Sequence, residues 1–283
     1  MTSSMPAPAE IARPLPDLPA WIRCFMEAEI PVLRETCEQI TALRANEDAT
    51  DANSIGEMIG GDPLMTLKIL IYASAHRGRR VETGAETIIA ALVMMGIPPF
   101  FHAFAEQPAV EERLGGDAPA LAGIGRVLRR AHRGARFALA FAVHRTDPNA
   151  ATIHAAALLH EFAELLLWCH APRLALAIEK IQRDDVTMRS SAAQLQVLNI
   201  DLADLQEALI SAWQLPRLLS ETGREPQANN AGARTVALAA RLARHTANGW
   251  DNAAVPDDIT DISELLNLSV AATLHLARGI DSD

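Results

Sequence analysis

The chain has 283 residues, 49% of them hydrophobic and only 4% aromatic, and its formal net charge is −10 with an isoelectric point near 5.4. The acidic balance argues against nucleic acid or an anionic membrane as the main partner, because the overall field repels phosphates. Helix-forming residues dominate almost every window, so we expect a globular, all-α protein.

Cysteine usage and hydropathy indicate the compartment. Cys24, Cys37 and Cys169 show no paired spacing, which favours a reducing environment. The N-terminus lacks the basic start and apolar stretch of a secretory signal, and no window reaches about 18 uninterrupted apolar residues. We therefore expect a cytoplasmic protein without membrane contact.

In the N-terminal third, segments with a helical pattern alternate with helix-breaking segments. Residues 1–19 are rich in proline, which predicts a flexible arm without a helix. A helix is predicted from Pro31 to about Leu43, and after a polar break Ser54 and Glu57 are spaced as a capping box.

Two further helix starts follow in this third. In "GGDPLMTLKILIYAS", Asp62 is a predicted N-cap and Pro63 the first helical residue. In "TGAETIIAALVMMGIPP", Thr83 and Glu86 suggest a second capping box, and Gly96 ends the helix before two prolines.

The rest of the chain is also helical in pattern, and no alternating strand is found. Helices are predicted at roughly 119–145, 150–169, 171–182, 188–198, 202–212, 230–247 and 260–278. Loops at 106–119 and 222–232 resemble exposed connectors. We expect one domain over residues 20–283, with an N-terminal lobe (20–110) and a C-terminal lobe (111–283).

The apolar stretch "LLHEFAELLLW" at 158–168 contains His160, Glu161 and Glu164. On a continuous helix these three side chains share an arc of about 100° and point into one pocket. The stretch departs from the zinc-protease motif H-E-x-x-H, because Glu164 replaces the second histidine. The alternative is a structural group in which the glutamates are hydrogen-bonding neighbours of a core histidine.

Several segments in order resemble the HDOD family, a non-catalytic branch related to the HD superfamily of metal-dependent phosphohydrolases. The resemblance covers roughly residues 30–245. It rests on "IPVL", "IGEMIGGDPLMTLKILIYAS", "TIIAALVMMGIPPF", "ALLHEFAELLLW" and "DLADLQEALISAWQLP". It implies an HD-like helical bundle and a role in bacterial signalling.

The resemblance also places the metal ligands of the HD superfamily on this chain. His160 and Glu161 stand at the adjacent His-Asp pair, the early histidine falls near Arg130 or His132, and the distant aspartate aligns with Arg241. An arginine has no lone pair to offer a cation and would repel it. We therefore expect no metal and no other cofactor, with Arg241 in the place of the cation, paired with Glu161, Glu164 or both. The alternative is that Arg241 is surface charge.

A basic stripe precedes this stretch. In "RVLRRAHRGAR", Arg126, Arg129, Arg130 and Arg133 recur at helical spacing and form one cationic face. This face is either a possible anion-binding surface, for a phosphate, a nucleotide or an acidic partner helix, or a solvated face neutralised by glutamates.

The combined expectation is a signalling module that acts through a protein partner and does not catalyse a reaction. The alternatives are a phosphohydrolase acting on nucleotides or cyclic dinucleotides through His132, His160 and Glu161, or a sensor of small anions. No Gly-rich phosphate loop and no Ser-His-Asp or Cys-His set is found.

Overall fold

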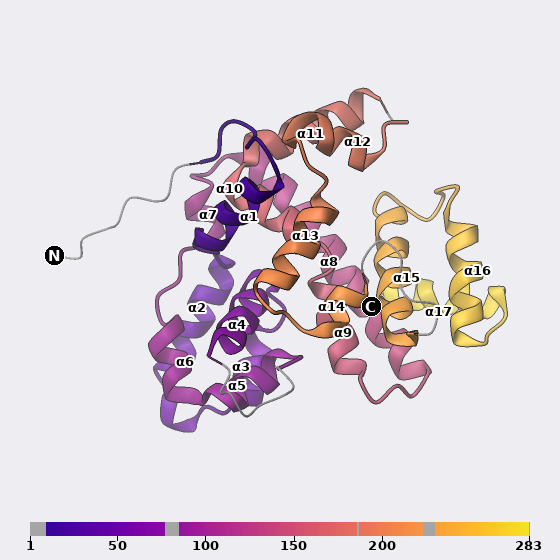
Figure 1. Cartoon of the computed structure of the whole chain (residues 1–283). Coiled ribbons are helices and arrows are strands. Elements are labelled where there is room, and N and C mark those ends of the chain that lie inside the picture. Colours follow the sequence, from indigo (N-terminus) through magenta and orange to yellow (C-terminus); the bar gives the residue numbers. More distant parts are fainter. Residues whose placement is uncertain (1–9, 77–84, 186, 223–229, 283) are drawn as a thin grey trace.

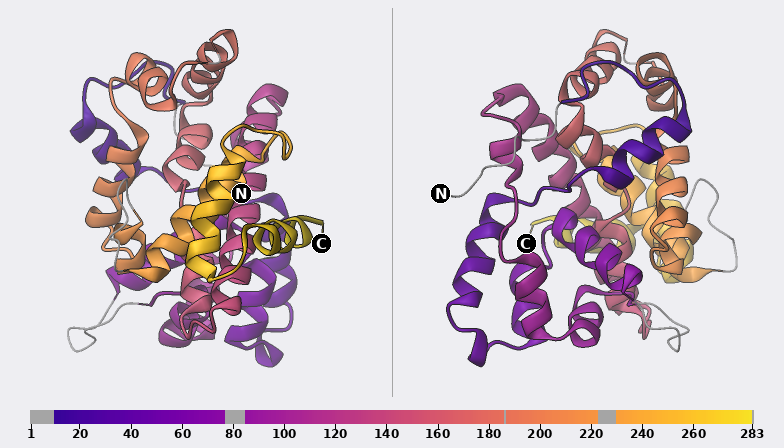
Figure 2. Two further views of the ribbon diagram at one scale, coloured as in Figure 1. Left: turned by 90° about the vertical axis from the view of Figure 1, so that its right-hand side faces the viewer. Right: turned by 60° about the vertical axis from the view of Figure 1, so that its left-hand side comes forward.

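The computed structural model describes residues 10–76, 85–185, 187–222 and 230–282. Within these ranges the chain forms α-helices, one short 3-10 helix and no strand, so the all-α prediction is confirmed. Helix α8 runs through the centre, with α2–α6 on one side and α15–α17 on the other (Figure 1). Two further views show α11 and α12 projecting together at one end of the molecule (Figure 2).

The helices of the first part are short. They are α1 (Leu18–Glu27), α2 (Arg34–Arg44), η1 (Glu47–Ala49), α3 (Ala52–Ile59), α4 (Pro63–Ala75), α5 (Ile88–Met95), α6 (Ile97–Phe104) and α7 (Val110–Arg113). The chain enters and leaves the α2–α6 group at one place. There the Val32 amide donates to Pro108 and the Val110 amide donates to Val32, which forms an isolated parallel bridge.

Helix α1 does not lie with the α2–α6 group, although the expected 20–110 lobe includes it. It packs against α13, and the indole of Trp21 donates to the Leu198 carbonyl at 3.1 Å. Trp21 and Phe25 are fully buried there. The amphipathic pattern of α1 predicts that one face is buried, but it does not identify the helix that covers it.

The second part is built around the 27-residue helix α8. Its elements are α8 (Ala118–His144), α9 (Ala150–Leu158), α10 (Phe162–His170), α11 (Pro172–Asp184), α12 (Ser190–Leu198), α13 (Leu202–Ala212), α14 (Arg217–Glu221), α15 (Ala231–His245), α16 (Val255–Leu266) and α17 (Val270–Ser282). Helices α9 and α15 make the most extensive contacts with α8, and α10, α11 and α17 also touch it.

Local capping explains where several helices begin. Asp62 caps α4 with Pro63 as its first residue, as predicted. The predicted cap at Ser54 is wrong, because Asp51 accepts from the Ser54 amide at 2.7 Å and Ser54 lies inside α3. The predicted cap residue Thr83 lies outside the described residues, and Thr87 caps α5. Gly96, with φ of 85°, ends α5 as predicted.

Two helices predicted as continuous are each divided in two. The pattern at 150–169 is α9 and α10, separated at residues 159–161, and the pattern at 260–278 is α16 and α17. Asn267 terminates α16 in the left-handed conformation, with φ of 53°. Apolar periodicity continues across both breaks because both halves face the same core, so it does not reveal them.

The described part of the proline-rich arm is attached to the body rather than extended into solvent. The Ile11 amide donates to the His170 carbonyl at 2.8 Å, and Asn199 donates to the Leu15 carbonyl at 3.1 Å. Helix α1 begins at Leu18 with Asp17 as its cap, inside the stretch expected to lack a helix. Proline is tolerated in the first turn of a helix, which permits this start.

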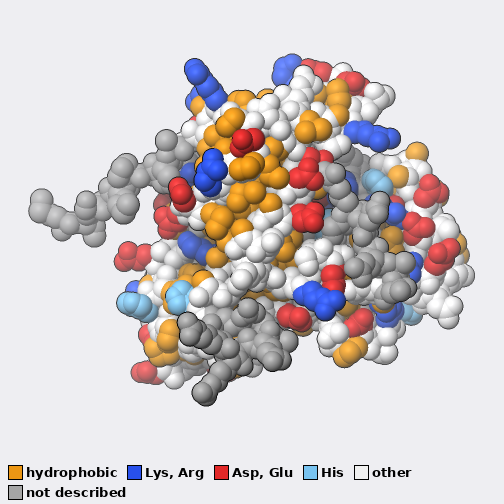
Figure 3. All heavy atoms as spheres, in the orientation of Figure 1, with side chains coloured by type: hydrophobic (Ala, Val, Ile, Leu, Met, Phe, Trp, Pro, Cys, Tyr) orange, Lys and Arg blue, Asp and Glu red, His pale blue; other side chains and the backbone are white. Residues whose placement is uncertain are grey.

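Charged side chains of both signs are spread over the visible surface, and apolar side chains gather over α1 and α13 (Figure 3). The segment Ala150–His170 is long and apolar enough to span a membrane by composition. However, 61% of its most apolar window is buried inside the fold, which is typical of the core helices of a globular protein.

Candidate functional site

The break between α9 and α10 positions the His-Glu pair. Gln206 of α13 hydrogen-bonds to the backbone on both sides of the break. Its amide nitrogen donates to the His160 carbonyl at 2.6 Å, and its amide oxygen accepts from the Ala163 amide at 3.3 Å. His160 and Glu161 therefore lie on a turn and not within a continuous helix. The expected common arc on one helix is wrong, although Glu161 and Glu164 still converge on one arginine.

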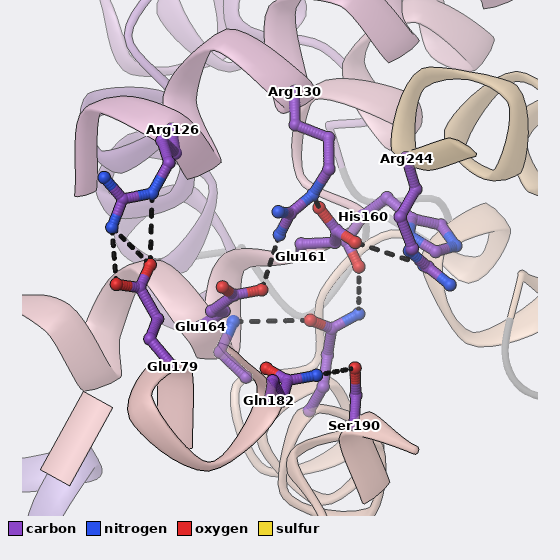
Figure 4. A network of polar contacts seen from close by, with 11 residues as sticks. Arg126, Arg130, His160, Glu161, Glu164, Glu179, Gln182, Ser190 and Arg244 are labelled. Atoms are coloured by element: carbon purple, nitrogen blue, oxygen red, sulfur yellow. Dashed lines mark hydrogen bonds and ion pairs between the residues drawn. The ribbon is translucent and has the colours of Figure 1, made fainter. Parts of the chain in front are cut away.

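That arginine is Arg130 of α8. Its Nε lies 2.5 Å from Glu161 and its terminal nitrogen lies 2.6 Å from Glu164 (Figure 4). The Arg130 side chain is 18% exposed and that of Glu161 is 15% exposed, so this contact is largely removed from water. A planar guanidinium with several fixed donors is suited to hold two carboxylates at once.

A second arginine completes the cluster. Arg244 of α15 contacts the other oxygen of Glu161 at 3.1 Å, and its side chain is 51% exposed (Figure 4). Glu161 thus accepts from α8 and from α15. The four residues Arg130, Glu161, Glu164 and Arg244 are called the Arg–Glu cluster below, and they link three parts of the fold.

The ionisation of the cluster follows from burial and charge. Burial raises the pKa of Glu161, but Arg130 and Arg244 outweigh it and hold that pKa below its ordinary value. Burial prevails at Glu164, whose pKa is raised. Burial also opposes the charge of Arg130, but the two carboxylates outweigh this and raise its pKa. The guanidinium therefore stays protonated at any physiological pH.

His160 is held beside the cluster in its neutral form. Burial lowers its pKa, the neighbouring Glu161 raises it, and the two arginines lower it again. Its Nδ1 is buried and has no hydrogen-bond partner among the described residues. A neutral imidazole next to two guanidinium groups adds no charge to the cluster.

The expected pairing of Arg241 with Glu161 or Glu164 is wrong. Arg241 forms ion pairs with two carboxylates of α16, Asp258 at 2.7 Å and Asp261. Asp258 is only 2% exposed and also contacts His245 at 2.6 Å. Because α16 supplies this buried acid next to α15, Arg241 joins two helices and Arg130 takes the place expected for it.

His132 does not join the cluster either. Its Nε2 hydrogen-bonds to the Gly61 carbonyl at 2.6 Å, in the turn before α4. It therefore links α8 to the N-terminal helices. Of the two residues that the resemblance offers for the early histidine, it is Arg130 that faces Glu161.

The basic stripe of α8 has several structural roles. Arg126 pairs with Glu179 of α11 at 2.5 Å (Figure 4). Arg133 makes two 2.5 Å contacts with Asp281, donates to the Thr246 carbonyl at 2.6 Å and lies over the rings of Phe137 and Trp250. Arg129 is exposed, and no ion pair of its side chain is found within the described part of the chain.

The cluster lies in the wall of a large open cavity of about 1500 Å³. One wall consists of α8 and α15, and the opposite wall consists of α11, α12, α13 and α14. Among the described residues, seven arginines contribute to the lining: Arg126, Arg129, Arg130, Arg133, Arg234, Arg241 and Arg244. Six carboxylates of the same described residues share it: Glu161, Glu164, Glu179, Asp201, Glu207 and Asp261. We call this cavity the arginine groove.

The side chains present do not fit a divalent metal ion at the His-Glu pair. A cation between Glu161 and Glu164 would have to displace the guanidinium of Arg130 and would be repelled by Arg244. Within the described ranges, no group of three or more His, Cys, Asp or Glu residues has the arrangement of a metal site. No chemical step through a metal is derived for this site.

Three contributors to the site were not found by the sequence analysis, namely Arg244, Gln206 and Glu179. Each contacts a residue 43 to 83 positions away in the sequence. Arg244 is spaced three residues from Arg241, on the same face of α15, and this spacing is the one local signal that could have indicated it.

The HDOD domain model matches residues 30–228 of the chain. The chain belongs to the HDOD family. The comparison of this HDOD chain with curated proteins found no match.

Solved structures share the fold of this HDOD protein. The MmoQ response regulator from Methylococcus capsulatus is similar with a TM-score of 0.66 at 17% sequence identity, over 89% of this chain and 99% of that one. A virulence factor from Campylobacter jejuni subsp. jejuni is similar with a TM-score of 0.60 at 16% identity, over 93% of both chains. At such identities the likeness establishes the fold alone.

Proposed function

We propose that this HDOD protein is a cytoplasmic regulatory module of bacterial signal transduction that acts by binding a protein partner and performs no catalysis. One observation carries the non-catalytic part: the Arg130 guanidinium lies within hydrogen-bond distance of both Glu161 and Glu164. A permanent positive charge stands where a hydrolytic metal would need open coordination positions.

Two further observations support a regulatory role. The family match covers most of the chain, and a protein of the same fold, MmoQ, is described as a response regulator. The arginine groove offers a large recessed surface next to the cluster, which is suited to a partner.

The first experiment tests catalysis. The purified full chain is equilibrated separately with manganese, iron and zinc, and its metal content and its hydrolysis of a panel of nucleotides and cyclic dinucleotides are measured. We expect substoichiometric metal and no turnover above that of the variants His160→Ala and Glu161→Gln. Stoichiometric metal together with turnover that both variants abolish would establish a phosphohydrolase.

The second experiment tests partner binding. The full chain is used to capture proteins from the bacterium that encodes it, and each candidate is then purified and mixed with the chain. We expect at least one candidate to form a complex of defined stoichiometry by light scattering. If no captured protein rebinds in purified form, the proposed function is wrong.

A further inference from the structure

The two helices that form one wall of the arginine groove, α8 and α15, run in opposite directions. Arg133 donates to the Thr246 carbonyl, whereas Arg145 donates to the Ala231 carbonyl and to Thr235. The two helices are therefore antiparallel. Arg129 and Arg234 consequently stand near opposite ends of the groove, about 24 Å apart along the α8 axis at a rise of 1.5 Å per residue.

Most arginines of the groove are neutralised by carboxylates of the protein. Arg126 pairs with Glu179, Arg130 with Glu161 and Glu164, Arg133 with Asp281, and Arg241 with Asp258 and Asp261. These pairs leave little charge for a ligand.

Arg129 and Arg234 differ from the other arginines. Both line the groove, and neither forms an ion pair within the described residues. Arg244 lies between them along the groove, 51% exposed, and shares Glu161 with Arg130. Positive charge that no carboxylate of the described residues neutralises therefore lies at Arg129 and Arg234, in a protein whose net charge is −10.

The length and lining of the groove select the class of ligand. Its volume of about 1500 Å³ exceeds the roughly 300–1,000 Å³ of a typical small-molecule site. A single phosphate or carboxylate would reach only one of the separated arginines. Among the described residues of the lining, Trp168 is the only indole, phenol or phenyl ring, and it is 1% exposed, so no exposed ring of that kind is available to stack a nucleobase.

The opposite wall has the character of a peptide-binding surface. Ser190, Ser191 and Gln194 of α12 provide hydrogen-bonding groups, and the buried side chains of Ile210 and Leu219 lie beneath this wall. A span of about 24 Å corresponds to roughly seven residues of extended chain at 3.3 Å per residue. An extended peptide with carboxylates near both ends matches the positions of Arg129 and Arg234.

We propose that the arginine groove binds an acidic, extended segment of the partner protein, with carboxylates about seven residues apart held by Arg129 and Arg234. This inference rests on the proposed function and specifies the chemistry of its partner. One carboxylate of the lining opposes such a ligand: Glu207 on α13 is exposed. Binding should therefore strengthen when Glu207 loses its charge.

The test selects peptides from a random library displayed on phage against the full chain, and measures the affinity of the selected peptides by fluorescence anisotropy. We expect Asp or Glu to be enriched at two positions about seven residues apart. The double variant Arg129→Glu/Arg234→Glu should bind these peptides at least about tenfold more weakly, because two attractive contacts become repulsive. Glu207→Gln should bind them more tightly.

The matched control is Arg23→Glu, which reverses an exposed arginine on α1 outside the groove and should leave affinity unchanged. Circular dichroism of every variant should show unchanged helix content. Tighter peptide binding by Glu207→Gln would also argue against misfolding, because a misfolded variant would bind more weakly. Inorganic polyphosphate and ATP serve as competitors.

Three results would overturn the inference. The first is that no peptide is selected. The second is that the selected peptides lack acidic enrichment, or bind the double variant as tightly as the wild type. The third is that polyphosphate or ATP binds more tightly than any peptide. A partner protein that rebinds the purified double variant as well as the wild type would leave the proposed function standing and reject the groove as its site.

Discussion

Arg130 Nε lies 2.5 Å from Oε2 of Glu161, although the two residues are 31 positions apart in the sequence. The same guanidinium holds Glu164, so one largely buried cation contacts two carboxylates. Its removal would leave both acids without their main counter-charge. The cluster is therefore expected to be a structural centre of the fold.

Replacing Arg130 by methionine should lower the free energy of unfolding by about 3 kcal/mol, because breaking a buried pair leaves an uncompensated charge. Urea denaturation at pH 7 measures this. Arg126→Met is the control: Arg126 is 46% exposed, and its pair with Glu179 should contribute at most about 1 kcal/mol. The triple variant Arg130→Met/Glu161→Gln/Glu164→Gln should recover part of the loss. Equal stability of Arg130→Met and wild type would contradict a structural role.

His170 should make the protein sensitive to acid. It is 3% exposed, its Nδ1 lies 2.8 Å from Arg113, and burial followed by that arginine lowers its pKa from 6.5 to about 3. The unfolded chain therefore binds a proton below pH 6.5 that the folded chain does not. This contribution to stability is present above pH 6.5 and is lost as the pH falls towards 3.

The size of this effect is measurable by urea denaturation between pH 7 and 4. Full protonation of one unfolded-state group changes stability by about 1.4 kcal/mol per pH unit. His170→Asn, which keeps an acceptor near Arg113, should show a shallower decline than the wild type. Parallel declines of the two proteins would mean that His170 does not cause the acid sensitivity.

Gly123 allows α8 to approach α10 closely. A Cβ atom at this position would overlap the ring of Trp168, which is 1% exposed. Gly123→Ala should therefore destabilise the protein by about 1–3 kcal/mol through overpacking. The control is Gly125→Ala. Gly125 lies two residues further along α8, and a Cβ atom there would not overlap a ring.

A double-mutant cycle separates this contact from helix propensity. Trp168→Leu should be destabilising alone, but the loss in Gly123→Ala/Trp168→Leu should be smaller than the sum of the two single losses by about 1 kcal/mol. Strict additivity of the two losses would show that the alanine methyl does not meet the indole.

Asp62 should contribute more to stability than an ordinary helix cap. It is buried and accepts hydrogen bonds from the Leu64 amide, the Leu33 amide and the Thr36 hydroxyl, each at 2.8 Å. Asp62→Ala should cost about 2–4 kcal/mol, because the cap is lost and other buried donors remain unsatisfied. Asp51→Ala removes an exposed cap of α3, which leaves no buried donor unsatisfied, and should cost clearly less. If thermal denaturation shows equal losses, the additional bonds of Asp62 contribute nothing.

The sequence by itself determined the helical class, most helix positions and the HDOD family. These properties depend on local periodicity, on caps such as Asp62, and on the order of short motifs. It also led to the prediction that an arginine, with no lone pair to offer, would exclude a metal from the His-Glu pair.

Only the tertiary structure decided which arginine does so. Arg130, Arg241 and Arg244 are chemically equivalent in the sequence. The buried acid Asp258 of α16 engages Arg241, and the break before α10 turns Glu161 towards α8 and α15. Pairing between residues 17 to 83 positions apart depends on how helices pack and which charges they bury. Local periodicity does not indicate which of these residues will pair.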